Sequence, residues 1–155
     1  MDYSYENLLK AYESLGVAES RVVMLRSDLR LLGPFNQPGR NAVLHAHYKA
    51  LSELMDLNKS TIVVSTASTS LCNTNIPFDP ANTPSEMGVL SEYIRMKPGA
   101  VRSFHPFISW AAIGAEANEI CNNVARHGFG PETPKSRMID RGALFVGIGG
   151  HPRKT

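Results

Sequence analysis

Three side chains with complementary chemistry lie close together near the middle of the chain. Arg102, Ser103 and His105 all fall within the short segment "VRSFHP". An arginine beside a hydroxyl is suited to bind the oxygens of a phosphate or a carboxylate, and histidine exchanges a proton near neutral pH. The same residue types also form ordinary surface pairs that contribute little. Taken alone, this cluster indicates an anionic small molecule as ligand but leaves a purely structural role open.

A loop and a predicted helix lead into this cluster. Thr83 is followed by Pro84 and then by Glu86, which is typical of a capped helix start and predicts a helix over residues 84–96. Such a cap stabilises a helix by about 0.5–2 kcal/mol, so the motif has a structural explanation that needs no ligand. Residues 68–81, rich in asparagine and proline, indicate an irregular loop that follows a strand.

The rest of the sequence alternates between helical and strand-like patterns. Helical periodicity covers residues 5–15, 41–56 and 115–128, and strand-like runs cover residues 21–26, 60–68, 107–114 and 142–150. This alternation favours an α/β layered domain with a mostly parallel central sheet flanked by helices. In such sheets ligands gather beyond the carboxyl ends of the strands. The segments after Ser27, Ser68 and Gly149 are expected at that edge.

Composition limits the class of protein. The chain has 155 residues, of which 43% are apolar and 19% charged, which suits one domain spanning residues 1–155. A formal net charge of +2 without a basic run argues against nucleic-acid binding. No apolar run reaches the roughly 20 residues of a membrane span, and the N-terminus does not resemble a secretory signal. We therefore expect a cytoplasmic protein without membrane contact.

Several familiar site patterns are excluded. "GIGG" at residues 147–150 follows a strand, but only five residues remain for the helix that a dinucleotide fingerprint needs. His45 and His47 are two residues apart and face different sides of a helix, so they do not form a zinc site, and His47 is expected to pack in the helix seam. Cys72 and Cys121 suggest neither a disulfide framework nor a catalytic nucleophile.

The segment "FDPANTPSEMGVLSEYIRMKPGAVRSFHPFISWAAIG" resembles the signature region of the aminoglycoside 3-N-acetyltransferase family. The resemblance extends to "VMLRSDLRLLG", "GFGPETPKSRM" and "ALFVGIGGHPRKT", and thus covers residues 22–155. It implies transfer of an acyl group from acetyl-CoA, or another acyl-CoA, to an amine. The acceptor would be an aminoglycoside or, as in relatives of polysaccharide pathways, an amino sugar carried on a nucleotide.

The resemblance also implies a set of cofactor-binding residues. The phosphates of coenzyme A call for N–H donors at a helix start and for arginine or hydroxyl partners. The residues that match the family's cofactor-side motifs are Ser27, Asp28, Thr83, Arg102, Ser103 and His105. Asp28 replaces a hydroxyl by a carboxylate, so we expect only its N–H to face the ligand. Arg26 stands where many relatives have histidine.

No catalytic residue is assigned within the chain. In the family, a histidine oriented by an acidic residue removes the proton from the acceptor, and it lies just downstream of the segment that matches residues 151–155. His151 matches a preceding family histidine. A missing general base typically forfeits about 10²- to 10⁴-fold in rate, so we expect little or no activity from this chain alone. It would be a gene fragment, a frameshifted copy or one part of a split protein.

The sequence leaves open which amine the chain would acetylate and whether a partner chain completes it. The loop "SLCNTNIP" at residues 70–77 contains no acid to pair with ammonium groups, which favours an amino sugar over a polycationic aminoglycoside. The non-enzyme alternative is a coenzyme A-binding remnant or a module completed by a partner chain. The apolar strand at residues 142–150 would then be covered by self-association or by a chain that supplies the missing C-terminal part.

Overall fold

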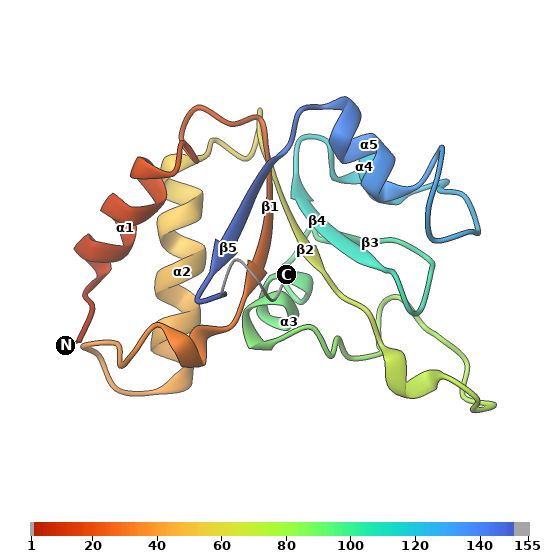
Figure 1. Ribbon diagram of the computed structural model, residues 1–155, viewed down its shortest axis with the longest axis horizontal. Coiled ribbons are helices and arrows are strands. Elements are labelled where there is room, and N and C mark those ends of the chain that lie inside the picture. The colour runs from red at the N-terminus through yellow and green to blue at the C-terminus, as the bar shows by residue number, and fades with distance from the viewer. Residues whose placement is uncertain (1, 151–155) are drawn as a thin grey trace.

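The computed structural model describes residues 2–150 and contains one mixed β-sheet with helices on both faces (Figure 1). The strands are β1 (Val22–Ser27), β2 (Thr61–Ser65), β3 (Val101–Arg102), β4 (Trp110–Gly114) and β5 (Leu144–Ile148), in the spatial order β3-β4-β2-β1-β5. The α-helices are α1 (Tyr5–Ser14), α2 (Arg40–Leu54), α3 (Val89–Arg95), α4 (Ala117–Cys121) and α5 (Pro134–Asp140). Two 3-10 helices, η1 (Leu29–Leu31) and η2 (Thr69–Leu71), follow β1 and β2.

The α/β architecture with a central sheet is confirmed, and the sheet combines both strand directions. β1 pairs in parallel with β2 and with β5, as expected. β4 runs antiparallel to β2, and β3 runs antiparallel to β4. β3 and β4 are joined by a short loop at residues 103–109, and a connection of that length can only join antiparallel strands. The two residues of β3 are too few to produce a strand pattern in the sequence.

One face of the sheet is covered by α1, α2 and α3. Val23 and Leu25 of β1 point to this face together with Ile62 and Val64 of β2, as strand alternation requires. Ser4 caps α1, because its hydroxyl accepts a hydrogen bond from the Asn7 N–H at 3.2 Å. This helical layer therefore holds most of the core.

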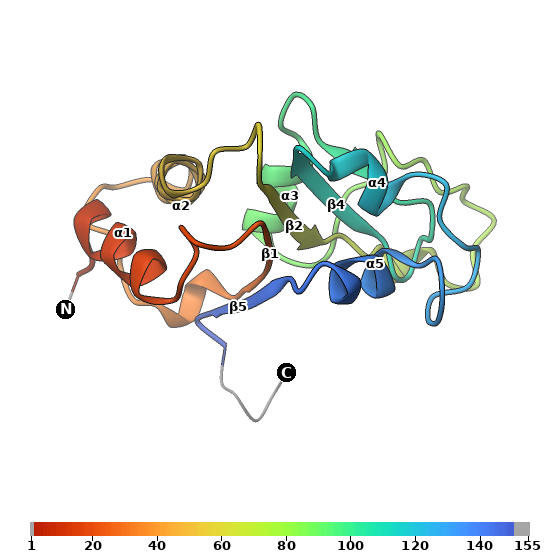
Figure 2. The same cartoon turned by 90° about the horizontal axis from the view of Figure 1, so that it is seen from above.

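The opposite face is covered only in part, by α4 and α5 (Figure 2). Met24 of β1, Val63 of β2 and Ala112 of β4 pack against Ile120 of α4 and Met138 of α5. The residues beyond them on the same face include Arg26, which is exposed, and Phe145, which is 57% exposed. The carboxyl half of this face is thus open to solvent.

The helix predicted over residues 84–96 starts later than expected, and Thr83 is not its N-cap. α3 begins at Val89, and Gly88 precedes it without any side-chain cap. The Glu86 carboxylate instead accepts hydrogen bonds from Thr69 and Ser70, and the Pro84 carbonyl accepts one from the Ser68 hydroxyl at 2.6 Å. These bonds to the preceding loop hold residues 84–86 outside the helix.

The predicted helix over residues 115–128 is also shorter, and a further helix lay outside the prediction. α4 ends at Cys121, and Asn123 has φ +49°, a left-handed conformation that stops a helix. α5 has the cap that the sequence suggested for α3. Thr133 accepts a hydrogen bond from the Ser136 N–H at 3.2 Å, with Pro134 at the first helical position. Among residues 2–150 no helix has the length and apolar character needed to span a bilayer.

Candidate active site

A cavity of about 1240 Å³ lies against the open part of the sheet. Its wall is formed by the carboxyl ends of β1, β2 and β5, by the start of α3 and by α5. The apolar part of the lining includes Met24, Trp110, Met138 and Phe145. This is the edge at which the parallel strands of an α/β sheet place a ligand. Of the three segments predicted at this edge, those after Ser27 and Gly149 line the cavity, and the loop directly after Ser68 does not.

The turn after β1 brings Ser27 and Asp28 to this cavity. The Asp28 N–H donates to the Ile148 carbonyl at 2.8 Å, which ties the end of β1 to the end of β5. Gly149 has φ +67°, and a Cβ there would lie 2.2 Å from the Asp28 carbonyl oxygen, so only glycine fits. The glycine that sequence inspection weighed as a phosphate loop thus has a packing role.

The side chain of Asp28 is also engaged. Its carboxylate accepts hydrogen bonds from the Arg30 Nε at 2.8 Å and from the Arg30 backbone N–H at 3.2 Å. These bonds, the side-chain one first, lower the pKa of the Asp28 carboxyl group. Because the N–H and the carboxylate of Asp28 both have protein partners, this residue has no free donor for a phosphate.

The other charged side chains around the cavity differ in whether other residues bind their charged groups. The Glu86 carboxylate accepts hydrogen bonds from the Thr69 hydroxyl at 2.7 Å, from the Ser70 N–H at 3.1 Å and from the Ser70 hydroxyl. These hydrogen bonds lower the pKa of Glu86, and the bond from the Ser70 hydroxyl has the largest effect. Arg26 and Lys135 make no ion pair with any residue in the described range 2–150. The cavity therefore contains two cations without a carboxylate partner.

Arg102 lies outside the lining of the cavity and holds together the loops behind its wall. Its guanidinium donates to the carbonyls of Thr66 and Thr83, to the Ser68 hydroxyl at 3.0 Å and to the Thr66 hydroxyl at 3.2 Å. The Phe78 ring also lies 4.8 Å from the guanidinium carbon. Burial, together with neighbouring Arg95, lowers the pKa of Arg102 to about 10. The guanidinium stays charged at neutral pH, and its donors point at protein acceptors.

A second arginine fixes the same loop. Arg95 is almost fully buried, pairs with Glu92 at 2.7 Å and donates to the Ala81 carbonyl at 2.7 Å. The pairing with Glu92 raises the pKa of Arg95. Thr83 accepts a hydrogen bond from the Asp79 N–H at 2.8 Å, which closes the turn. The segment 79–83 is therefore clamped between Arg95 and Arg102.

Ser103 and His105 belong to the loop between β3 and β4. The buried Ser103 hydroxyl accepts a hydrogen bond from the backbone N–H of Trp110 at 2.9 Å. His105 Nδ1 accepts from the N–H groups of Phe107 and Ile108 at 3.3 Å and 3.2 Å. Since Nδ1 is an acceptor in this arrangement, the neutral ring carries its proton on Nε2, which is the nitrogen that remains for a ligand.

The structure thus divides the six predicted cofactor residues into two groups. Ser27 and Asp28 line the cavity, whereas Thr83, Arg102, Ser103 and His105 lie outside its lining. Arg102 binds the Thr83 carbonyl, while Ser103 and His105 bind residues of their own β3–β4 connection. The loop after β2 connects the groups, because Ser65 lines the cavity while Thr66 and Ser68 bind Arg102. The cofactor role of all six remains a prediction. The match proposed for His151 lies outside the described residues.

Lys135 and Trp110 are among the cavity residues that the sequence did not single out. Lys135 belongs to α5, whose Thr-Pro-Lys-Ser cap was a readable signal. Trp110 lies in a correctly predicted strand, and its indole Nε1 is buried without a hydrogen-bond partner in the described part of the chain. No pattern in the sequence indicates an unpaired indole.

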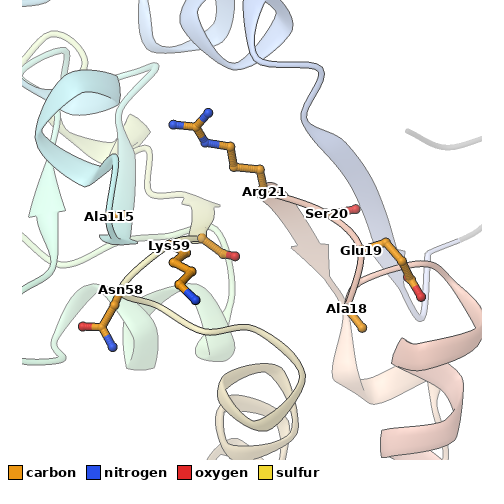
Figure 3. A pocket seen from close by; sticks show the side chains of 8 residues that line it. Ala18, Glu19, Ser20, Arg21, Asn58, Lys59 and Ala115 are labelled. Carbon is orange, nitrogen blue, oxygen red and sulfur yellow. The ribbon is translucent and has the colours of Figure 1, made fainter.

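A smaller depression, of about 540 Å³, lies at the opposite end of the strands (Figure 3). Its charged side chains include Arg21, just before β1, and Lys59, just before β2. Arg21 lies 2.6 Å from Glu116, and Lys59 lies 3.6 Å from Asp56. Because these charges are paired and ligands of such sheets bind at the carboxyl edge, the larger cavity is the better candidate site.

The mixed sheet, with its cavity at the carboxyl ends of the parallel strands, defines an α/β domain with a cavity where such sheets usually bind ligands. The family model described as aminoglycoside 3-N-acetyltransferase matches residues 24–155, and the chain belongs to this family. The resemblance seen in the sequence is thereby confirmed.

A curated relative agrees with this assignment, and two solved structures share the fold. Aminoglycoside N(3)-acetyltransferase III from Pseudomonas aeruginosa is 25% identical over 152 residues, which are 88% of this chain and 55% of the relative. The solved structure of AAC-VIa bound to sisomicin has a TM-score of 0.82 at 24% identity, with 100% of this chain and 62% of that one covered. AAC-IIIb in a binary complex with CoASH has a TM-score of 0.74 at 20% identity, with 90% and 57% covered. The chain spans about half the length of the curated relative.

Proposed function

We propose that this chain takes part in acyl-CoA-dependent N-acyl transfer, in which an acetyl or other acyl group moves to an amine of an amino sugar or aminoglycoside. The observation that carries the proposal is the family match over residues 24–155 together with a large cavity at the carboxyl edge of the sheet. The names of relatives, aminoglycoside N(3)-acetyltransferases, support the reaction class. A neighbour in complex with CoASH supports acyl-CoA as the co-substrate.

The cavity suits a long ligand that is polar at one end. Its methionine and aromatic side chains offer apolar contact, and Ser27 adds a hydroxyl at the end of β1. In the proposed arrangement Ser27 donates a hydrogen bond to a phosphate oxygen of the co-substrate in the cavity. His105 lies outside the cavity lining, so its Nε2–H would serve only a part of the co-substrate that extends beyond the cavity. Bound acyl-CoA supplies the activated acyl group as a thioester.

The remaining predicted cofactor residues act in this proposal through the structure around the site. Arg102 and Thr83 hold the turn at residues 79–83, and Ser103 holds the end of the β3–β4 hairpin. Asp28 keeps the Arg30 guanidinium beside the cavity, since the two side chains lie 2.7 Å apart. These four are positioning residues.

Acyl transfer also needs a base that takes a proton from the acceptor ammonium. His47 is unsuited because it is buried between α1 and α2, with Tyr12 2.7 Å from Nδ1. We assign no general base within residues 2–150. We therefore propose that the chain alone binds acyl-CoA but transfers the acyl group slowly or not at all, as the sequence led us to expect. A cytoplasmic location is part of the same proposal.

Amide hydrogen exchange with and without acetyl-CoA tests the proposal and locates the ligand. Protection should concentrate in residues 26–31, 86–89 and 147–150, which border the cavity, and should be absent from residues 18–21 and 58–60 of the smaller depression. Acetylated product should be sought by mass spectrometry, because exposed Cys72 would react with thiol-detecting reagents. Protection confined to the smaller depression would refute the assigned site.

A non-catalytic role is the second candidate, and the open sheet face favours it. Phe145 is 57% exposed and Ile139 is 69% exposed, and both border the cavity. A coenzyme A-binding module completed by a second chain would cover these side chains. Both candidates allow the chain alone to bind acetyl-CoA without forming product, so the comparison needs a chain extended by the C-terminal half of a relative. Absence of product from that extended chain, with amino sugars and aminoglycosides as acceptors, would favour the non-catalytic candidate over the enzyme.

A further inference from the structure

The charges around the cavity bear on which amine it accepts. Among residues 2–150, five charged side chains line it, three of them basic and two acidic: Arg26, Arg30, Lys135, Asp28 and Glu86. Asp28 is paired with Arg30 at 2.7 Å. Glu86 is bound by the donors of Thr69 and Ser70. Neither carboxylate is left without partners for an incoming ammonium group.

Arg26 is the basic residue best placed to meet a ligand. It is exposed, it points to the open face of β1 beyond Met24, and no residue between positions 2 and 150 forms an ion pair with it. Its strand partner on β5 is Gly147, where an added Cβ would meet nothing within 4 Å. The guanidinium therefore has open space on one side and no carboxylate to neutralise it.

We propose that Arg26 makes this cavity select an amine acceptor that carries a negative charge, such as the phosphate of an amino-sugar phosphate, over a polycationic aminoglycoside. This inference rests on the proposed function, because it narrows the acceptor of the same reaction. A guanidinium binds phosphate oxygens in a bidentate manner, whereas an ammonium group near it is repelled. The acid-free loop at residues 70–77 acts in the same direction.

The fluorescence of Trp110 can measure the binding of these acceptors. It is the only tryptophan in the sequence and it lines the cavity, so its fluorescence reports on what enters. Glucosamine 6-phosphate and glucosamine form a matched pair that differs only in the phosphate, and kanamycin represents the polycations. Each is titrated with and without saturating coenzyme A at one fixed ionic strength, because salt screens exposed charges.

Glucosamine 6-phosphate should bind about tenfold more tightly than glucosamine, which is the factor expected from one charge-assisted hydrogen bond. Kanamycin should bind most weakly of the three. Arg26→Gln should abolish the difference, and Arg26→Lys should restore part of it. Arg40→Gln is the matched control, since Arg40 is exposed at the start of α2 outside the cavity. Circular dichroism of each variant confirms the fold.

Equal binding of the two sugars, or tighter binding of kanamycin, would overturn the inference. It would also fail if Arg26→Gln weakened binding of coenzyme A while the preference for the sugar phosphate stayed intact, because Arg26 would then serve the co-substrate. Absence of coenzyme A binding in the wild type would instead reject the proposed function. The two failures are thus distinguishable.

Discussion

Arg102 is suited by its side chain both to bind a phosphate and to join two loops of the protein. Sequence inspection assigned it to phosphate binding, whereas its guanidinium joins the carbonyls of Thr66 and Thr83 from separate loops. Arg102→Gln would leave buried acceptors without donors, each costing about 1–3 kcal/mol, so we expect the free energy of unfolding to fall by about 3 kcal/mol. Arg102→Lys should rescue little, because one ammonium cannot span both loops. Urea unfolding measures the change.

The control for this prediction is Arg26→Gln, which removes an exposed arginine that forms no ion pair within residues 2–150 and should change stability by less than about 0.5 kcal/mol. If Arg102→Gln proved as stable as the wild type but no longer bound acetyl-CoA, the guanidinium would be a direct phosphate ligand. The structural role would then be the lesser one.

His47 gives the fold a dependence on pH. It is fully buried, with the Tyr12 hydroxyl 2.7 Å from Nδ1 and the Tyr3 hydroxyl 3.3 Å from Nε2. Burial lowers the pKa of His47 from its ordinary 6.5 to about 4. The unfolded chain therefore takes up a proton at higher pH than the fold does. The contribution of His47 to the free energy of unfolding is therefore fully present above pH 6.5. It falls by about 3 kcal/mol as the pH drops toward 4.

Urea unfolding of the wild type and of His47→Asn between pH 7 and pH 4 checks this prediction. Carboxylates contribute to acid sensitivity in both proteins, so the informative quantity is the difference between their slopes. The variant should lose less stability on acidification although it is less stable at pH 7. Parallel pH profiles would show that His47 is not the group that titrates.

At the scale of elements, two threonine–proline pairs differ in whether they start a helix. Thr133 caps α5, whereas Thr83 lies in a turn before α3. Thr133→Ala should cost about 1 kcal/mol of stability, as lost caps usually do, and should weaken ligand binding because α5 forms a wall of the cavity. Thr83→Ala should cost less. Thermal unfolding of both variants makes the comparison, and a larger loss for Thr83→Ala would contradict it.

How far each element could be predicted depends on whether its signal is local. β1 and β2 were predicted because runs such as Val22–Leu25 are apolar on both faces, which suits a strand buried between two helical layers. The start of α3 was mispredicted because Glu86 is bound by η2, a contact with residues distant in sequence. The two-residue β3 offered too little pattern to be recognised.

The candidate site was predictable to a similar extent. Ser27 reaches the cavity because it ends a parallel strand, and topology alone predicts that position. The partners of Arg102 come from loops 66–68 and 80–83, which meet only in the folded chain. Spacing along the sequence therefore suggested a ligand for a side chain whose donors are used by the protein.

At the scale of the whole molecule, an apolar surface lies at the border of the cavity within residues 2–150. Leu31, Ile139 and Phe145 border the cavity and are each more than half exposed. We expect the isolated chain to self-associate through this face, in a concentration-dependent way, because exposed apolar patches of this kind are usually covered. Light scattering coupled to size exclusion measures the mass at several concentrations.

Ile139→Lys combined with Phe145→Glu should shift the chain toward the monomer. Ile76→Lys is the matched control, because Ile76 is 64% exposed in a loop that does not line the cavity. A wild type that stays monomeric at all concentrations, or a control variant that dissociates as readily as the double variant, would contradict this use of the surface.

The central claim is that the cavity at the carboxyl edge of the sheet binds an acyl-CoA. Isothermal titration of the folded chain with acetyl-CoA tests it most directly, with a Ser27→Ala variant in parallel. We predict one binding site per chain and weaker binding in the variant, whose lost hydroxyl borders the cavity. Absence of any binding heat at several temperatures, from a sample shown to be folded, would contradict the claim.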